Sequence, residues 1–292
     1  MLCVTIGDDD SVTDIVQLGH SSPPSNKSMN QPVQQQLPKH LTLHIGDGEA
    51  LLERVTQTSE QELVLAPVEL HRRNIQRRLR ESQTPKDGIQ FTDPTGVANQ
   101  LLGVDSNPPK TLDRIDRLSM IRSIHSEDEV SLRSPAVPSD TQGIEQVRTE
   151  IENITGFHPK RLNILETVGN GLTPPLDSDA AELVETATTI ERTLREHTSK
   201  AVSGVESIRR ATRRIRETDG EIFQQAYPNI DRISLVGVSS VAISYIDLLH
   251  ALLATVAVPV HIHFRAGTGT YLAERVSQLF DIANPGTVVF PS

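Results

Sequence analysis

A short turn, Gly46-Asp47-Gly48-Glu49, occupies the position of a phosphate-binding loop. It follows an apolar strand-like segment, residues 41–45, and precedes an amphipathic segment, residues 49–57. Backbone N–H groups at such a turn attract phosphate. A nucleotide loop of the G-x-x-x-x-G-K-[ST] type also needs a lysine for the terminal phosphates and a hydroxyl for Mg²⁺. The turn has neither, and its two carboxylates would repel phosphate, so we expect a degenerate nucleotide loop and no cofactor.

A second chemically rich segment directly follows the next expected strand, residues 62–66. It begins with His71 and contains five arginines within nine positions: Arg72, Arg73, Arg77, Arg78 and Arg80. One interpretation is a helix that presents guanidinium groups, Arg77 included, to a phosphate backbone. The other is a solvated helix face with Ile75 and Leu79 packed inward. Few aromatic residues are available to stack on bases, since they make up only 3% of the chain.

Another arginine cluster lies between residues 209 and 216. Acidic residues alternate with it, namely Glu206, Glu217 and Asp219. This pattern is typical of a surface helix with ion pairs along its length. We therefore do not assign this cluster to nucleic-acid binding.

Two further patterns are weak evidence for a metal or anion site. His261 and His263 lie two positions apart and should share one face of a strand, but no third ligand is near in sequence, so we expect no metal. The turn from Gly267 to Thr270 has a single G-x-G between a strand and a helix. An anion site and a tight turn explain it equally well.

Several enzyme motifs are absent. There is no G-x-S-x-G nucleophile motif, and none of the six lysines has an acidic residue two positions before it. The strand expected at residues 232–239 ends in Ser239-Ser240, where a Mg²⁺-binding strand would end in Asp or Glu. We assign no catalytic residue.

Composition limits the class of protein. The 292 residues carry a formal charge of −10, and Cys3 is the only cysteine, which rules out a disulfide framework within the chain. No window is apolar enough for a membrane span, and the N-terminal residues lack a basic region. We expect a cytoplasmic protein. The acidic, arginine-rich composition favours a salt-adapted cytoplasm over an ordinary acidic mesophilic protein.

Strand-like and helical segments alternate at both ends of the chain. This order predicts an α/β fold with a parallel sheet flanked by helices. We expect a disordered tail at residues 1–39, the first half of the α/β domain at 40–125, a linker and all-helical insertion at 126–226, and a second half at 227–292. A further strand is expected at 286–290, which suggests a truncated second half.

The chain resembles the N-terminal region of the AddB-like family, the helicase–exonuclease B subunits of the UvrD-like helicase superfamily, in a divergent archaeal form. The resemblance covers residues 41–292. It rests on five segments that match the family pattern: residues 64–73, 91–98, 112–118, 236–240 and 264–272.

The resemblance implies a P-loop-type parallel sheet with a helical insertion. It also implies that the element after the second strand contacts single-stranded DNA, through Pro67, His71, Arg72 and Arg73. The family's nuclease domain, with its acidic–lysine site and cysteine-bound cluster, has no counterpart here. We therefore expect a non-catalytic scaffold or DNA-binding domain of a repair or recombination complex, with a helicase or nuclease subunit as partner. Two alternatives remain: a protein-interaction domain without DNA contact, and a nucleotide-dependent enzyme that uses the Gly267–Thr270 turn.

Overall fold

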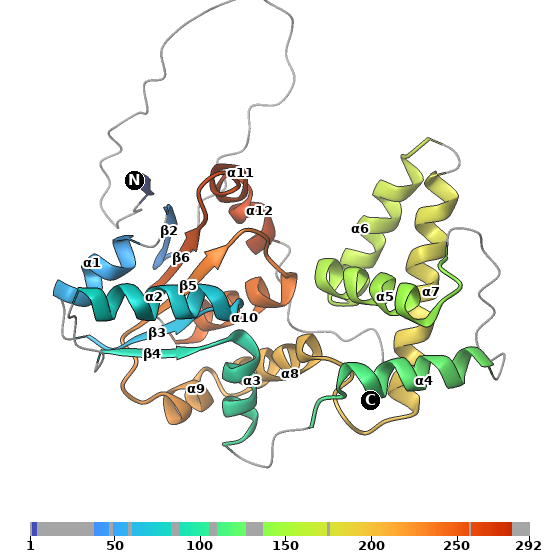
Figure 1. The fold of residues 1–292 in the computed structure, drawn as a ribbon, viewed down its shortest axis with the longest axis horizontal. Coiled ribbons are helices and arrows are strands. Elements are labelled where there is room, and N and C mark those ends of the chain that lie inside the picture. Colours follow the sequence, from blue (N-terminus) through green and yellow to red (C-terminus); the bar gives the residue numbers. More distant parts are fainter. Residues whose placement is uncertain are drawn as a thin grey trace, which may run out of the picture.

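The computed structural model contains a six-stranded sheet, which lies on the side of the molecule opposite helices α5 to α7 (Figure 1). The structure describes residues 2–4, 38–46, 49–57, 60–82, 88–104, 110–126, 137–173, 176–256 and 258–281. In spatial order the strands are β1 (Leu2–Val4), β2 (Leu41–Ile45), β6 (Val260–Phe264), β5 (Arg232–Val238), β3 (Glu62–Leu65) and β4 (Ile89–Thr92).

Five of these strands, β2 to β6, run parallel, and β1 pairs antiparallel with β2. The predicted α/β fold with a parallel sheet is thus confirmed. After β3 the chain moves outward to β4, whereas after β5 it moves the opposite way to β6. The neighbouring strands β3 and β5 therefore form a topological switch point, the place where open α/β sheets bind ligands at the carboxyl ends of their strands.

Twelve helices are present among the described residues. They are α1 (Glu49–Gln57), α2 (Glu69–Glu81), α3 (Pro94–Leu102), α4 (Arg114–Ser126), α5 (Thr141–Thr155), α6 (Pro159–Asn170), α7 (Leu176–Glu196), α8 (Gly204–Glu217), α9 (Glu221–Ala226), α10 (Ile243–Thr255), α11 (Gly269–Ala273) and α12 (Val276–Asp281). No helix among them is long and apolar enough to cross a membrane.

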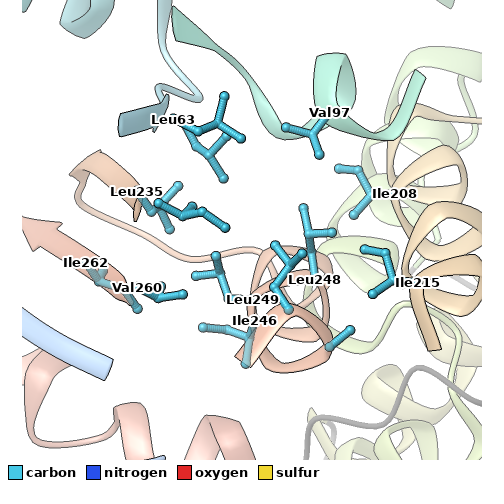
Figure 2. Packing of buried hydrophobic residues seen from close by; sticks show 14 of the residues in the cluster. Leu63, Val97, Ile208, Ile215, Leu235, Ile246, Leu248, Leu249, Val260 and Ile262 are labelled. Atoms are coloured by element: carbon cyan, nitrogen blue, oxygen red, sulfur yellow. The ribbon is translucent and has the colours of Figure 1, made fainter. Parts of the chain in front are cut away.

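Alternate residues of each strand face two separate cores, as the two-residue period of a strand requires. One core packs Leu63, Leu235 and Ile262 against α3, α8, α10 and α12. Figure 2 shows how leucines and isoleucines of α8 and α10 fill the space beside these strands. The opposite face packs Val64 and Val236 against α1 and α2.

Helices α4 to α7 extend away from the sheet as an arm (Figure 1). Two small apolar clusters and a buried set of ion pairs stabilise this arm. Arg148, 1% exposed, bridges Glu145, Glu152 and Glu191 with N···O distances of 2.7, 3.2 and 2.7 Å. Although burial opposes its charge, these carboxylates raise the pKa of Arg148, which therefore remains charged.

Some sequence-based boundaries were wrong. Helical spacing of apolar residues predicts a helix at 111–123, but α4 runs from Arg114 to Ser126, because Thr111 forms a bridge with Ala201 and the side chain of Asp113 accepts from the N–H of Asp116. The sequence also predicts a helix at 200–218, but α8 begins only at Gly204, after the same bridge. The sequence pattern does not single out α6 and α9, and the segment 271–281, predicted as one helix, forms two short helices, α11 and α12. The strand expected at 286–290 lies outside the described residues, as does most of the expected tail.

Candidate functional site

The turn after β2 is built unlike a nucleotide loop. The N–H of Gly46 donates to the carbonyl oxygen of Phe264 at 3.0 Å, so it is already used within the sheet. Glu49 begins α1, with its carboxylate 3.8 Å from the guanidinium of Arg78 on α2. A carboxylate in the first turn offsets the positive end of the helix dipole, which would otherwise attract phosphate. Asp47 and Gly48 lie outside the described residues.

The arginine-rich segment forms α2, whose first turn lies at the carboxyl end of β3. Pro67 is partly buried before the helix, while Val68 and Leu70 are exposed. The buried face consists of Ile75 and Leu79, as the sequence pattern predicted. Arg73, Arg77 and Arg80 are exposed, whereas Arg72 and Arg78 are half-buried. The first turn of α2 lies beside the switch point between β3 and β5.

The guanidinium groups of α2 have acidic partners. Glu69 binds Arg72 at 2.6 Å and Arg73 at 2.9 Å, and Arg77 lies 3.6 Å from Glu81. Hydrogen bonds from Arg72 and Arg73 lower the pKa of the Glu69 carboxyl. Exposed pairs of this kind contribute little to stability. A phosphate can therefore replace a carboxylate at Arg73 or Arg77, whose side chains are 72% and 65% exposed.

His71 differs from the arginines because it faces the sheet. Its imidazole lies over Gly237 of β5, and a β-carbon at Gly237 would overlap the ring. Gly237 has a φ of +71°, at a register irregularity between Val236 and Val238. Such bulges are common beside functional sites. Nδ1 of His71 is buried without a hydrogen-bond partner among the described residues.

Arg265, directly after β6, adds a positive charge near His71. Burial, and secondarily the Arg265 charge, lower the pKa of His71, so its imidazole is neutral at pH 7. Arg265 and the Ser239-Ser240 pair after β5 are exposed at the carboxyl edge of the sheet. Sequence reasoning did not select Gly237 or Arg265, because their proximity to His71 depends on which strands are neighbours.

His261 and His263 share one face of β6, as expected, and a third imidazole lies beside them. His44 on β2 stacks on His263 with ring centroids 4.4 Å apart, and its Nε2 lies 2.9 Å from Nδ1 of His261. Arg54 of α1 reaches into this group. Its Nη2 is 3.1 Å from Nε2 of His263 and 3.1 Å from the buried carboxylate of Glu62. No group of three or more metal-ligating side chains with suitable geometry occurs in the part of the chain that the structure describes.

These histidines are held neutral. Burial, then the charge of Arg54, lower the pKa of His44 to about 4, and the same two causes lower the pKa of His261 to about 3. Burial also lowers the pKa of His263. A neutral imidazole next to a guanidinium accepts a hydrogen bond from it. The cluster therefore joins α1 to the sheet by hydrogen bonds.

The Gly267–Thr270 turn has a packing explanation. A β-carbon at Gly269 would lie 2.9 Å from side-chain atoms of both Ile45 and Phe264, so only glycine fits between β2 and β6. Gly267 has a φ of +97°, which also favours glycine. The helix that follows, α11, is only five residues long. No observation at this turn favours nucleotide binding.

Comparison with known protein families gives a match over most of the chain. A model described as "Halobacterial UvrD-like protein" matches residues 27–291, nearly the whole chain. The chain belongs to this family. The match confirms the UvrD-like relationship and the halophilic origin that the sequence suggested, at the level of this family. The fold is that of a helicase-like domain. No curated protein matches this UvrD-like chain significantly.

Proposed function

We propose that this UvrD-like chain is a non-catalytic domain of a DNA repair or recombination helicase–nuclease complex, of the AddB-like type. One observation supports the proposal most directly. The chain belongs to a helicase-like family, but Glu49 occupies the position at which a nucleotide-binding loop needs a cation. Gly46 also uses its N–H within the sheet. The chain then serves as a scaffold in the cytoplasm, with a helicase or nuclease subunit as partner.

Calorimetry with ATP tests the loss of the nucleotide site. We expect no heat of binding in the presence of Mg²⁺, because neither a lysine nor a hydroxyl is available at the turn. Sub-millimolar affinity that depends on Mg²⁺ would contradict the proposal.

The proposed DNA contact is the edge formed by Pro67, His71 and the first arginines of α2. Three features support it: the position of the first turn of α2 beside the switch point, the exposed guanidinium groups of Arg73 and Arg77 with the half-buried Arg72 beside them, and the nearby Arg265. Binding to single-stranded DNA should weaken as salt rises, because phosphate contacts release counterions.

Reversing two of these charges tests the assignment. Arg72→Glu combined with Arg73→Glu should weaken single-strand binding at least about tenfold, since two phosphate contacts become repulsive. The matched control is Arg192→Glu with Arg214→Glu, which changes the net charge equally on α7 and α8. Equal losses in both double variants would show only a net-charge effect, and unchanged binding in the α2 variant would remove this helix from the interface.

A protein-interaction domain without DNA contact is the second candidate. An exposed apolar row on and just after α6 favours it, formed by Ile164, Val168 and Leu172, which are 49%, 61% and 45% exposed. Residues four apart lie on one helix face. This candidate predicts that a partner subunit co-purifies with the chain after nuclease treatment, and that Val168→Glu prevents it. A chain that purifies alone under these conditions would argue against it.

A further inference from the structure

The imidazole of His71 is held in place by a residue of the neighbouring strand. His71 lies in the first turn of α2, where its backbone N–H donates to the carbonyl oxygen of Val68 at 3.0 Å. A β-carbon built at Gly237 would lie only 2.1 Å from Nδ1 of His71 and 2.6 Å from its Cγ. Glycine therefore leaves room for the ring on β5, and the φ of +71° at Gly237 also favours glycine.

This contact determines which nitrogen of His71 carries the proton. The Cα–H bond that a β-carbon at Gly237 would replace is directed at Nδ1, and a Cα–H group donates weak hydrogen bonds. Nδ1 is closed to solvent and has no hydrogen-bond partner among the described residues, so a proton there would be an unsatisfied buried donor. A neutral imidazole has one N–H group, which is therefore on Nε2.

The Nε2–H group of His71 is available to a ligand. The ring is half-buried, and of its two nitrogens Nδ1 is the one closed to solvent. No hydrogen bond joins the His71 side chain to another described residue, so Nε2 faces solvent. His71 therefore presents one donor of fixed direction at the carboxyl edge of the sheet.

The charged groups around this donor favour a negatively charged acceptor. Arg265 is exposed, and its backbone N–H donates to the carbonyl oxygen of Val238 on β5 at 3.0 Å. Burial, and then the charge of Arg265, lower the pKa of His71, and no carboxylate among the described residues offsets this effect. Glu69, in the same turn as His71, is bound by two arginines, so a positive charge remains there as well. These surroundings suit a phosphate oxygen.

We propose, on the basis of the DNA contact proposed above, that Gly237 is a positioning residue: it fixes the His71 ring so that Nε2–H binds a phosphate oxygen of single-stranded DNA. His71 contributes a neutral donor of fixed direction, whereas Arg72 and Arg73 contribute charge. Because the acceptor belongs to the DNA backbone, this contact does not depend on the base sequence.

The protonated nitrogen can be identified without DNA. A long-range ¹H–¹⁵N spectrum of the labelled full chain at pH 7 distinguishes the two neutral forms of imidazole, and comparison with His71→Gln identifies the His71 signals. We expect the proton on Nε2. Gly237→Ala should displace the ring and change these signals. A proton on Nδ1 in the unchanged chain would overturn the proposal, whether or not DNA binds.

Two substitutions of His71 test the contact with DNA. The side-chain amide of Gln reaches the position of Nε2 and donates from there, whereas the amide of Asn reaches only the position of Nδ1. Binding of a fluorescein-labelled oligothymidylate, measured by anisotropy, should weaken about tenfold in His71→Asn, because one hydrogen bond to a charged group is lost. His71→Gln should retain most of the affinity.

The result separates this contact from the proposed function. Equal affinities of the unchanged chain, His71→Asn and His71→Gln would refute the His71 contact alone. No binding by the unchanged chain would refute the proposed DNA contact, and the phosphate ligand with it.

A double substitution shows whether Gly237 acts through His71. Gly237→Ala should weaken DNA binding about as much as His71→Asn, under conditions where circular dichroism shows that each chain is folded. In a chain that already carries His71→Ala, the new β-carbon meets no ring, so Gly237→Ala should cause no further loss. Gly171→Ala, on the arm and with no atom nearer than 3.4 Å to the new β-carbon, should leave the affinity unchanged. An equal loss from Gly237→Ala in both backgrounds would overturn the positioning role.

Discussion

At the residue scale, the histidine cluster shows how polar side chains are accommodated beneath α1. Arg54 donates to the carboxylate of Glu62, to the hydroxyl of Ser234 and to neutral imidazoles, and Ser234 also donates to Glu62. A buried carboxylate needs such partners, because it loses its hydration on folding. The three imidazoles therefore have a structural role in the packing of α1 on the sheet.

The depressed pKa values of these histidines make folding stability depend on pH. The unfolded chain binds their protons near pH 6.5, whereas folded His44 does so only near pH 4. Their contribution is fully present above pH 6.5 and is lost as pH falls toward 4, since protonation then favours the unfolded state. A single histidine of this kind should cost about 2 kcal/mol between pH 7 and pH 5, measurable by urea unfolding at each pH.

One substitution distinguishes the cluster from other histidines. His261→Gln should reduce the loss of stability between pH 7 and pH 5, because one buried titrating group is removed. His125→Gln, at an exposed position on α4, should leave it unchanged. An equal acid sensitivity in the wild-type chain and His261→Gln would show that the cluster does not control it.

At the element scale, the helices of the arm depend on ion pairs as well as on apolar contacts. Arg148 of α5 contacts Glu191 of α7, which is fully buried. Glu191 also binds Arg195, and Arg195 binds Glu206 of α8. Burial and the neighbouring Glu152 raise the pKa of Glu191, so its ionised form depends on these arginines. The pairs thus join three helices at defined positions.

Removal of the central arginine should therefore destabilise the arm strongly. Arg148→Met keeps much of the side-chain volume but leaves buried carboxylates without their cation, at a cost of about 3–5 kcal/mol. Arg77→Met on α2, where the ion pair is exposed, should cost less than about 0.5 kcal/mol. Chemical denaturation of both variants measures the difference. Equal costs would mean that the buried pairs add nothing beyond exposed ones.

At the scale of the whole molecule, α8 contacts both the helical arm and the core of the sheet. Its Ser207 hydroxyl lies 3.3 Å from that of Thr111, beside the bridge that precedes α4, and Glu206 joins the ion pairs of the arm. Its Ile208 and Ile215 pack into the same core as β3, β5 and β6 (Figure 2). The arm and the sheet therefore share one helix, and unfolding of that helix affects both.

A cavity at this shared helix tests the coupling. Ile208→Ala should cost about 2–5 kcal/mol, because the side chain is 1% exposed and its neighbours cannot close the space. Ile115→Ala, on α4 at 78% exposure, should stay within about 0.5 kcal/mol. Amide hydrogen exchange should show lower protection in both the sheet and the arm for Ile208→Ala. Loss in only one of them would contradict the coupling.

The sequence by itself determined the local elements. Short apolar runs between helical segments predicted the five parallel strands. Thr92 or Asp93 before Pro94 is typical of a helix start, and in the structure Asp93 caps α3 by accepting from the N–H of Gly96. The missing lysine at Gly46–Glu49 and the buried face of α2 also follow from residue types alone. These features depend on neighbours within a few positions along the chain, which a sequence pattern records directly.

Only the tertiary structure decided which distant residues meet. His44 and His261 come together because β2 and β6 are adjacent, and His71 lies over Gly237 because β3 and β5 are. Arg161 binds Asp247, which lies 86 positions further along the chain. The order of the strands and the packing of the helices determine these contacts, and both depend on the apolar surface buried in the whole core. A local sequence pattern does not contain this information. The histidine cluster and the basic edge therefore became apparent only in the folded chain.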